Sequence, residues 1–170
     1  MNNSYVFSKA KVSVVFYDRT IDWRGKVIRF FNLTRLHHCG IIFSMKNESI
    51  LLMSDKTHRA KFIDADRFHE TFFKPYKTID LGFSDVSVTQ ITNYIKTPYI
   101  GDARSIVFWY FISRGLLRIK HLQPKTCALL VSNILRLCGF QVEDCVTPRK
   151  LYRELQNYAV DSNCRTSGSR

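Results

Sequence analysis

The stretch that decides the fold is PKTCALLVSNILRLCGF, residues 124–140. Apolar residues recur in it at the spacing of an amphipathic helix, Thr126 stands where an N-cap would, and Gly139 follows as a stop signal. Cys127 therefore falls in the first helical turn. There, unpaired backbone N–H groups, the positive end of the helix dipole and the neighbouring Lys125 favour a thiolate over a thiol. The stretch predicts a short helix with a candidate nucleophile at its start, although a free cysteine is more often a buried structural residue.

A second stretch, LHHCGIIF over residues 36–43, predicts a strand that begins with a histidine. Gly40 follows His38 by two positions and so shares its face, where it leaves room beside the ring and lets another element approach. A cysteine nucleophile needs a base within hydrogen-bond reach, and His38 is the candidate. His37 points to the opposite face and is the weaker candidate. The alternative is that His38 is simply a satisfied polar residue of the strand.

The other cysteines and histidines are expected to be structural. Cys138 falls in the last turn of the predicted helix, near the negative end of its dipole, and should pack in the core. His58, His69 and His121 stand in polar or basic segments and should lie at the surface. The five cysteines are irregularly spaced and form no Cys-x-x-Cys pair. The sequence therefore predicts no metal site, no cofactor, and free thiols in a reducing compartment.

The length of 170 residues fits one domain with a sizeable core. We expect this domain over residues 1–160 and a disordered, basic and polar tail over residues 161–170. Strands are expected over residues 11–17, 36–43, 50–53, 61–63 and 77–81. Helices are expected over residues 22–31 and 102–112. Another should end at Lys96 and be capped by Ser84 or Ser87, and two more should start at Cys127 and at Pro148. A helical turn is expected near residues 66–69. The predicted fold class is α+β, a small antiparallel sheet packed against helices.

The charge balance is strongly basic. Lys and Arg number 26 against 14 acidic residues, which gives a net charge of +12. Such an excess should attract an anionic membrane surface or another polyanion. Nucleic acid is less favoured as a partner, because the basic residues are spread from Lys9 to Arg153 rather than gathered in one stripe. A soluble protein with a basic exterior is the simpler alternative.

No segment predicts export or a membrane span. The N-terminus lacks a basic segment followed by an apolar one. The longest apolar run, residues 106–112, is far shorter than the roughly 20 residues that cross a bilayer. We therefore expect a cytoplasmic protein, with a location peripheral to a membrane as the alternative.

The order of these segments resembles the circularly permuted branch of the papain-like NlpC superfamily. That branch contains the lecithin:retinol acyltransferase-like enzymes, and in it the histidine precedes the cysteine. The resemblance covers about residues 12–155. It is carried by Arg29-Phe30-Phe31, His38-Cys39-Gly40-Ile41-Ile42, Thr97-Pro98-Tyr99, Thr126-Cys127, residues 137–140, and Val146-Thr147-Pro148 followed by Leu151. The resemblance implies a permuted papain-like fold in which Cys127 is the nucleophile and His38 the base.

The branch also has a third polar residue, on the strand that returns from the histidine strand, which orients the imidazole. Here that strand reads LLMSD over residues 51–55, with no Glu, Gln or His. Ser54 or Asp55 could take the role, or it could be filled in another way.

The activity that the resemblance implies is thiol-dependent acyl chemistry. The protein would be a hydrolase, acting as a peptidase, an amidase or a lipid esterase, or an acyltransferase. Its substrate would be a peptide, an amide or a lipid ester, and no cofactor is implied. The alternative is a catalytically inactive basic module of the same fold that binds nucleic acid or an anionic membrane.

Overall fold

The computed structural model describes residues 6–18, 36, 38–46, 48–54, 60–71, 75–96 and 126–167. Of residues 6–8, 88 and 159–167 it describes the backbone alone. The predicted helices over residues 22–31 and 102–112 lie outside the described residues, as do Asp55, His37, His58 and His121.

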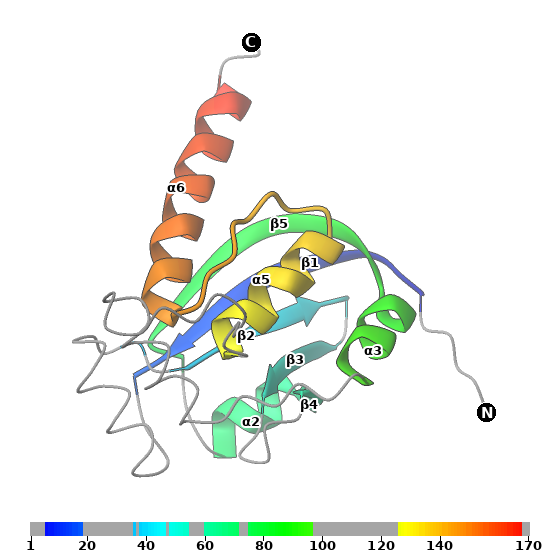
Figure 1. Ribbon diagram of the computed structural model, residues 1–170. Coiled ribbons are helices and arrows are strands. Elements are labelled where there is room, and N and C mark those ends of the chain that lie inside the picture. Colours follow the sequence, from blue (N-terminus) through cyan, green and yellow to red (C-terminus); the bar gives the residue numbers. More distant parts are fainter. Residues whose placement is uncertain are drawn as a thin grey trace, which may run out of the picture.

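A five-stranded antiparallel sheet with strand order β4-β3-β2-β1-β5 forms the centre of the described structure (Figure 1). Its strands are β1 (Val6–Tyr17), β2 (His38–Ser44), β3 (Ser49–Ser54), β4 (Ala60–Asp64) and β5 (Lys77–Ser87). Each predicted strand is confirmed, and β1 and β5 are longer than predicted. A tight turn joins β2 to β3, in which the Met45 N–H donates to the Glu48 carbonyl at 2.8 Å. The predicted α+β class is confirmed.

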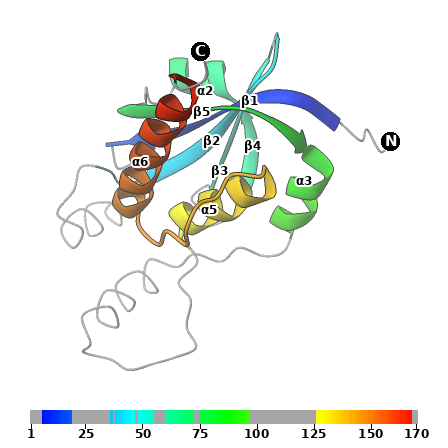
Figure 2. The ribbon, with the colours of Figure 1, turned by 90° about the horizontal axis from the view of Figure 1, so that it is seen from above.

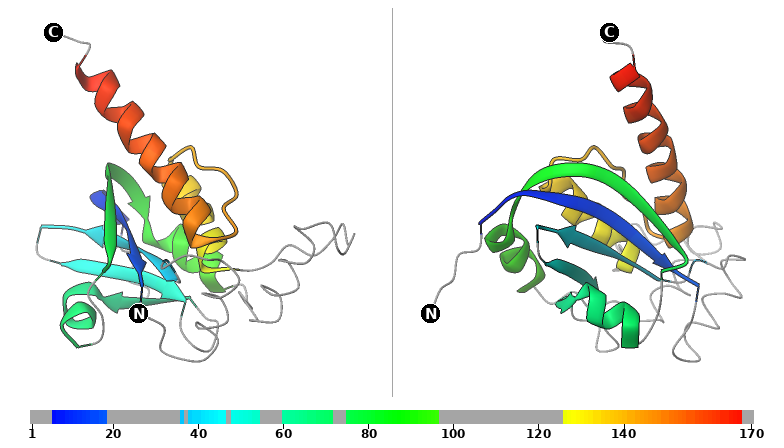
Figure 3. Two further views of the ribbon diagram at one scale, coloured as in Figure 1. Left: turned by 90° about the vertical axis from the view of Figure 1, so that its left-hand side faces the viewer. Right: turned by 180° about the vertical axis from the view of Figure 1, so that it is seen from behind.

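Four helices are described: α2 (Ala65–Thr71), α3 (Val88–Lys96), α5 (Cys127–Leu137) and α6 (Pro148–Ser167). On one face of the sheet, α5 lies between α6 and α3 (Figure 2). The short helix α2 lies on the opposite face, as the left-hand view of Figure 3 shows. None of the described helices is both long and apolar enough to cross a membrane.

The side chains of β2 alternate between the two faces of the sheet. Cys39, Ile41 and Phe43 point into the larger core, which α3, α5 and α6 cover. The other face carries a smaller cluster, in which Val15 and Tyr17 of β1 pack against residues of α2. Because successive strand residues point to opposite faces, His38 and Cys39 start on different sides of the sheet.

The predicted start of the last helix is confirmed. Pro148 occupies the first position of α6, where its missing N–H costs nothing. The Thr147 hydroxyl accepts the Lys150 N–H at 3.2 Å and so caps the helix. α6 continues through Ser167, so the backbone of residues 161–167 is helical. The single domain over residues 1–160 and the disordered tail over residues 161–170 stay predictions.

The choice between the two predicted caps of α3 is also decided. Ser87 is the residue before the helix, and its hydroxyl accepts the Gln90 N–H at 3.4 Å. Ser84 was the wrong alternative, because it lies within β5, and its hydroxyl donates to the Cys138 carbonyl instead.

Candidate active site

Cys127 is the first residue of α5, as predicted, and is partly exposed. Thr126 precedes it in an extended conformation and is only 5% exposed. Its hydroxyl oxygen accepts the Leu129 N–H at 3.1 Å and donates to the Val146 carbonyl at 2.7 Å. Thr126 is therefore an N-cap that also fixes the start of the helix to the segment before α6.

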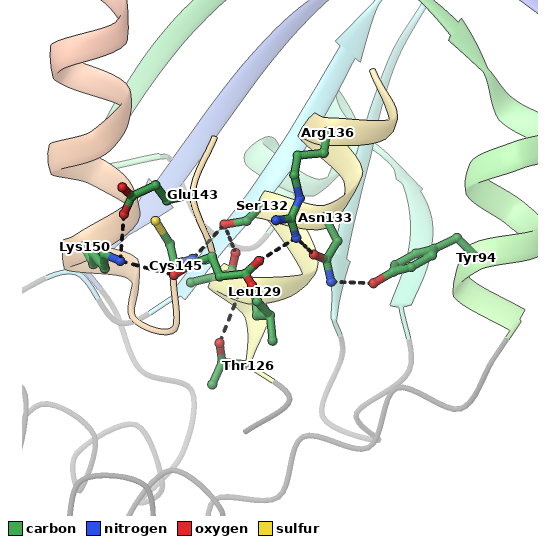
Figure 4. Close-up of polar contacts among 11 residues, drawn as sticks. Tyr94, Thr126, Leu129, Ser132, Asn133, Arg136, Glu143, Cys145 and Lys150 are labelled. Atoms are coloured by element: carbon green, nitrogen blue, oxygen red, sulfur yellow. Dashed lines mark hydrogen bonds and ion pairs between the residues drawn. The ribbon is translucent and has the colours of Figure 1, made fainter. Parts of the chain in front are cut away.

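Further polar contacts hold α5 to its surroundings (Figure 4). The buried Ser132 hydroxyl donates to the Ala128 carbonyl at 3.0 Å and accepts the Cys145 N–H at 3.3 Å. On the other side, the Asn133 amide donates to the Tyr94 hydroxyl of α3 at 2.5 Å. These contacts come from two separate neighbours, so they fix the position of the helix that carries Cys127.

His38 is the first residue of β2, and its side chain interacts electrostatically with the Cys127 side chain. Both residues are partly exposed. Its place at the beginning of the strand lets the ring reach the start of α5, although His38 belongs by alternation to the opposite face of the sheet. The structure thus brings together the two side chains that the sequence singled out, from segments 89 positions apart.

The main chain of Ser54, at the end of β3, also acts on His38, and its interaction raises the pKa of the imidazole, as a carbonyl that faces a ring N–H would. Ser54 is one of the two residues that the sequence left open for orienting the ring, and that role stays a prediction. Asp55 lies outside the described residues.

The electrostatics of the two side chains favour an ion pair. The pKa of Cys127 is held well below its ordinary value, although burial would raise it. The largest cause is the interaction with the Cys39 thiol, and the positive charge of His38 and the Cys39 backbone add to it. Burial alone would lower the pKa of His38. The negative charge of Cys127 and the hydrogen bonds to Cys127 and Ser54 raise it instead. A thiolate beside an imidazolium is the form that these shifts favour.

Cys39 is a site residue that the sequence analysis did not single out. It is fully buried on the α5 face of β2, in the core against which Cys127 packs. Burial, followed by its interaction with Cys127, raises the pKa of Cys39 well above its ordinary value. Cys39 is therefore a neutral thiol. Strand alternation could have identified Cys39 from the sequence, since it turns the residue after His38 toward the face of the sheet that the helix covers.

Tyr17 and His69 form a second contact beside His38. Tyr17 is the cross-strand partner of His38, and their ring centroids lie 6.4 Å apart. The Tyr17 hydroxyl hydrogen-bonds with Nε2 of His69 at 3.0 Å. The prediction that His69 is a simple surface residue is wrong, since it is half-buried and has this partner. Burial lowers the pKa of His69 and raises that of Tyr17, so both are neutral near pH 7.

Gly40 allows the close approach that its place after His38 predicts. A Cβ atom at this position would lie 2.9 Å from Leu51 Cδ1 and 2.9 Å from the backbone oxygen of Leu52. Since one of these atoms belongs to the backbone of β3, a larger residue would push β3 away from β2. Gly40 therefore sets the distance between the strand of His38 and the strand that ends at Ser54.

The other described cysteines have different surroundings. Cys138 and Cys145 are buried, and both are free thiols, as are Cys39 and Cys127. Burial raises the pKa of Cys138 to about 12. Its predicted place in the core is confirmed. Within the described ranges, no group of three or more His, Cys, Asp or Glu side chains could hold a metal ion.

Comparison with known proteins assigns the chain to no family. No family model matches the chain, and no curated protein matches it significantly. The resemblance to the permuted NlpC branch therefore rests on the residues of the chain itself, together with the arrangement of His38 and Cys127.

Proposed function

We propose that the protein is a thiol-dependent hydrolase or acyltransferase of the permuted papain-like type. Cys127 would be the nucleophile and His38 the base. The observation that carries this proposal is the interaction of His38 with Cys127 at the capped start of α5, in which the charge of each side chain shifts the pKa of the other toward the charged form. The chain order of a histidine strand followed by a cysteine helix supports the permuted form of the fold.

In the proposed reaction, the Cys127 thiolate attacks the carbonyl carbon of an amide or ester, and a thioester forms as the carbon–nitrogen or carbon–oxygen bond breaks. The His38 imidazolium gives its proton to the leaving amine or alcohol. We assign the backbone N–H of Cys127 to the developing oxyanion, because the first turn of a helix has N–H groups without intrahelical partners. Neutral His38 then takes a proton from the second acceptor as this acceptor attacks the thioester carbon. The carbon–sulfur bond breaks, which releases the product and returns Cys127 to the thiolate beside the imidazolium.

The second acceptor decides the class of enzyme. Water makes the protein a peptidase, an amidase or a lipid esterase, and an amine or hydroxyl makes it an acyltransferase. The net charge of +12 favours a substrate that is anionic or lies at an anionic membrane surface.

A direct test is acyl transfer from activated esters. Incubation with p-nitrophenyl esters of different chain length should release p-nitrophenol in a burst and leave an acyl group on Cys127, which mass spectrometry of the peptides locates. Cys127→Ala should lose both signals. Cys138→Ala changes the other cysteine of this helix and should keep both. A burst that survives in Cys127→Ala would contradict the proposal.

The second candidate function is a catalytically inactive module that uses the same charge of +12 to bind nucleic acid or anionic membrane. It predicts no acyl-enzyme. It also predicts retention on nucleic acid or acidic vesicles that falls with salt and that Cys127→Ala leaves unchanged.

A further inference from the structure

Tyr17 packs beside His38 on the face of the sheet that α2 covers. It is the last residue of β1 and the direct partner of His38 in the antiparallel register. Side chains of such partners lie on the same face, with their Cβ atoms about 5 Å apart. The two ring centroids are 6.4 Å apart and the planes are tilted by 31°, which is the spacing of a packed aromatic pair. Tyr17 is only 3% exposed, so its neighbours restrict its ring.

Helix α2 holds the Tyr17 ring at two points. The Phe68 ring meets it edge to face, with centroids 6.1 Å apart and an interplanar angle of 78°. The Tyr17 hydroxyl hydrogen-bonds with Nε2 of His69 at 3.0 Å. The helix itself is fixed to the end of β4, where the Asp64 carboxylate accepts the Arg67 N–H at 2.9 Å. A packed ring and a hydrogen bond from one anchored helix therefore fix the position of the tyrosine.

The contact between Tyr17 and His69 carries no charge near pH 7. Burial lowers the pKa of His69 and raises the pKa of Tyr17, so the imidazole and the phenol are both neutral. A neutral imidazole and a phenol share a hydrogen bond whichever of them donates. The pair therefore acts on His38 through packing and adds no electrostatic field to the site.

The His38 ring needs such support if it is to transfer protons. A proton passes efficiently only when the ring nitrogen lies within about 3 Å of its partner atom. β3, which returns from β2, has no acidic, amide or imidazole side chain that could orient the ring. The Tyr17 ring fills the space beside His38 on the α2 face, and so limits how far the imidazole can turn away from α5.

We propose that Tyr17, anchored by His69, is a positioning residue that keeps the His38 imidazole turned toward Cys127. The inference rests on the proposed function, because it assigns a further residue to the same site. Orientation and charge have separate effects. The charge of His38 acts on Cys127 through space and depends little on the angle of the ring, whereas proton transfer depends on it strongly. Loss of Tyr17 should therefore slow turnover and leave the pH profile of Cys127 alkylation in place.

The experiment measures steady-state turnover of p-nitrophenyl esters, after the burst, beside the alkylation profile. Tyr17→Leu removes the ring and should lower kcat by about 10- to 100-fold, with KM changed by less than about threefold. Tyr17→Phe keeps the ring without the hydroxyl and should retain most of the lost turnover. His69→Asn should match Tyr17→Phe, and the double variant should be no slower than the slower single variant, since both remove the same bond.

Tyr158→Phe is the matched control. It removes a tyrosine hydroxyl near the other end of α5, where the ring packs against Phe140, and should leave turnover unchanged. Circular dichroism checks that each variant is folded. The inference is overturned if folded Tyr17→Leu keeps turnover within about twofold of the wild type, or if its alkylation profile shifts together with its turnover. If Tyr17→Leu does not fold, unchanged turnover in both Tyr17→Phe and His69→Asn overturns it.

Nuclear magnetic resonance tests the placement without any acyl chemistry. Nuclear Overhauser contacts should join the ring protons of Tyr17 and His38, and the His38 ring signals should move in His69→Asn but not in Tyr158→Phe. If these contacts are seen but no ester acylates Cys127, the acyl chemistry fails and the placement of the imidazole stands. If Cys127 turns over esters but the contacts are absent, only this inference fails.

Discussion

The two ends of helix α5 carry the same residue type in opposite settings. Cys127 opens the helix, is partly exposed, and contacts both His38 and Cys39. Cys138 closes the helix as its C-cap, is 7% exposed, and lies in the apolar core. Hydrogen bonding from Cys39 and the charge of His38 lower the pKa of Cys127, whereas burial raises that of Cys138 to about 12.

This contrast separates two causes of a cysteine's reactivity. The helix dipole favours the thiolate at the first turn and the thiol at the last, so it contributes to the contrast in the expected direction. The larger causes are the partners, because a hydrogen-bond donor and a cation face one sulfur, while apolar side chains surround the other. The helix places the sulfur, and residues of the neighbouring strand lower its pKa.

The largest expected effect is the difference in alkylation rate between these two cysteines. At about pH 7, a thiol with a pKa of about 12 is a thiolate in only about one molecule in 10⁵. We expect iodoacetamide to label Cys127 at least about 10³ times faster than Cys138. Labelling of Cys127 should persist at mildly acidic pH, because its pKa is lowered. Peptide mapping after timed quenching measures both rates, and equal rates would remove the contrast.

Removal of the cation should make Cys127 more like Cys138. In His38→Asn the positive charge is lost, so the pKa of Cys127 should rise and its labelling profile should shift to higher pH. We expect labelling at mildly acidic pH to slow, since the thiolate fraction falls about tenfold for each unit by which the pKa rises. His69→Asn changes the nearby histidine that bonds with Tyr17, and should leave the profile in place. An unchanged profile in His38→Asn would show that Cys39 alone activates the thiol.

A third change moves β3 away from β2 near His38, at the end of α5 that carries Cys127 and not at the end that carries Cys138. Gly40→Ala forces a Cβ atom against the backbone oxygen of Leu52 and should destabilise the protein by about 1–3 kcal/mol, as overpacking does. Urea unfolding measures this loss. The shift of β3 should also weaken the contact between Ser54 and His38, so labelling of Cys127 should slow while that of Cys138 stays slow. Stability within about 0.5 kcal/mol of the wild type would contradict the close approach.

The smallest expected effect comes from removing the side-chain hydrogen bonds that fix each end of α5. Thr126→Ala removes the N-cap and the bond to the Val146 carbonyl, and should cost about 1 kcal/mol of unfolding free energy. Thr126→Ser keeps the hydroxyl and should cost less than half as much. Ser84→Ala is the counterpart at the other end, where the hydroxyl donates to the Cys138 carbonyl. Of these variants, Thr126→Ala alone should change the alkylation rate of Cys127.

Local patterns were enough for the elements of the fold that could be compared. β-branched and aromatic residues marked β1, the apolar run after His38 marked β2, and helical spacing with a Thr cap and a Gly stop marked α5. The sequence near Ser84 and Ser87 could not show which of them caps α3. The answer depended on β5, which continues through Ser84 to pair with β1. The two site residues, Cys127 and His38, were recognised because each stands at the end of an element, where a side chain is available for chemistry.

The sequence by itself determined a cysteine at a helix start, a histidine at a strand start, and a glycine that permits close approach, since these depend on spacing within a few residues. Only the tertiary structure decided that His38 and Cys127 interact, and that the Ser54 backbone and Cys39 act on their pKa values. The physical reason is that these contacts join segments far apart in the chain. They depend on how α5 packs on the sheet, and no periodicity along the sequence encodes which residues will face each other across that interface.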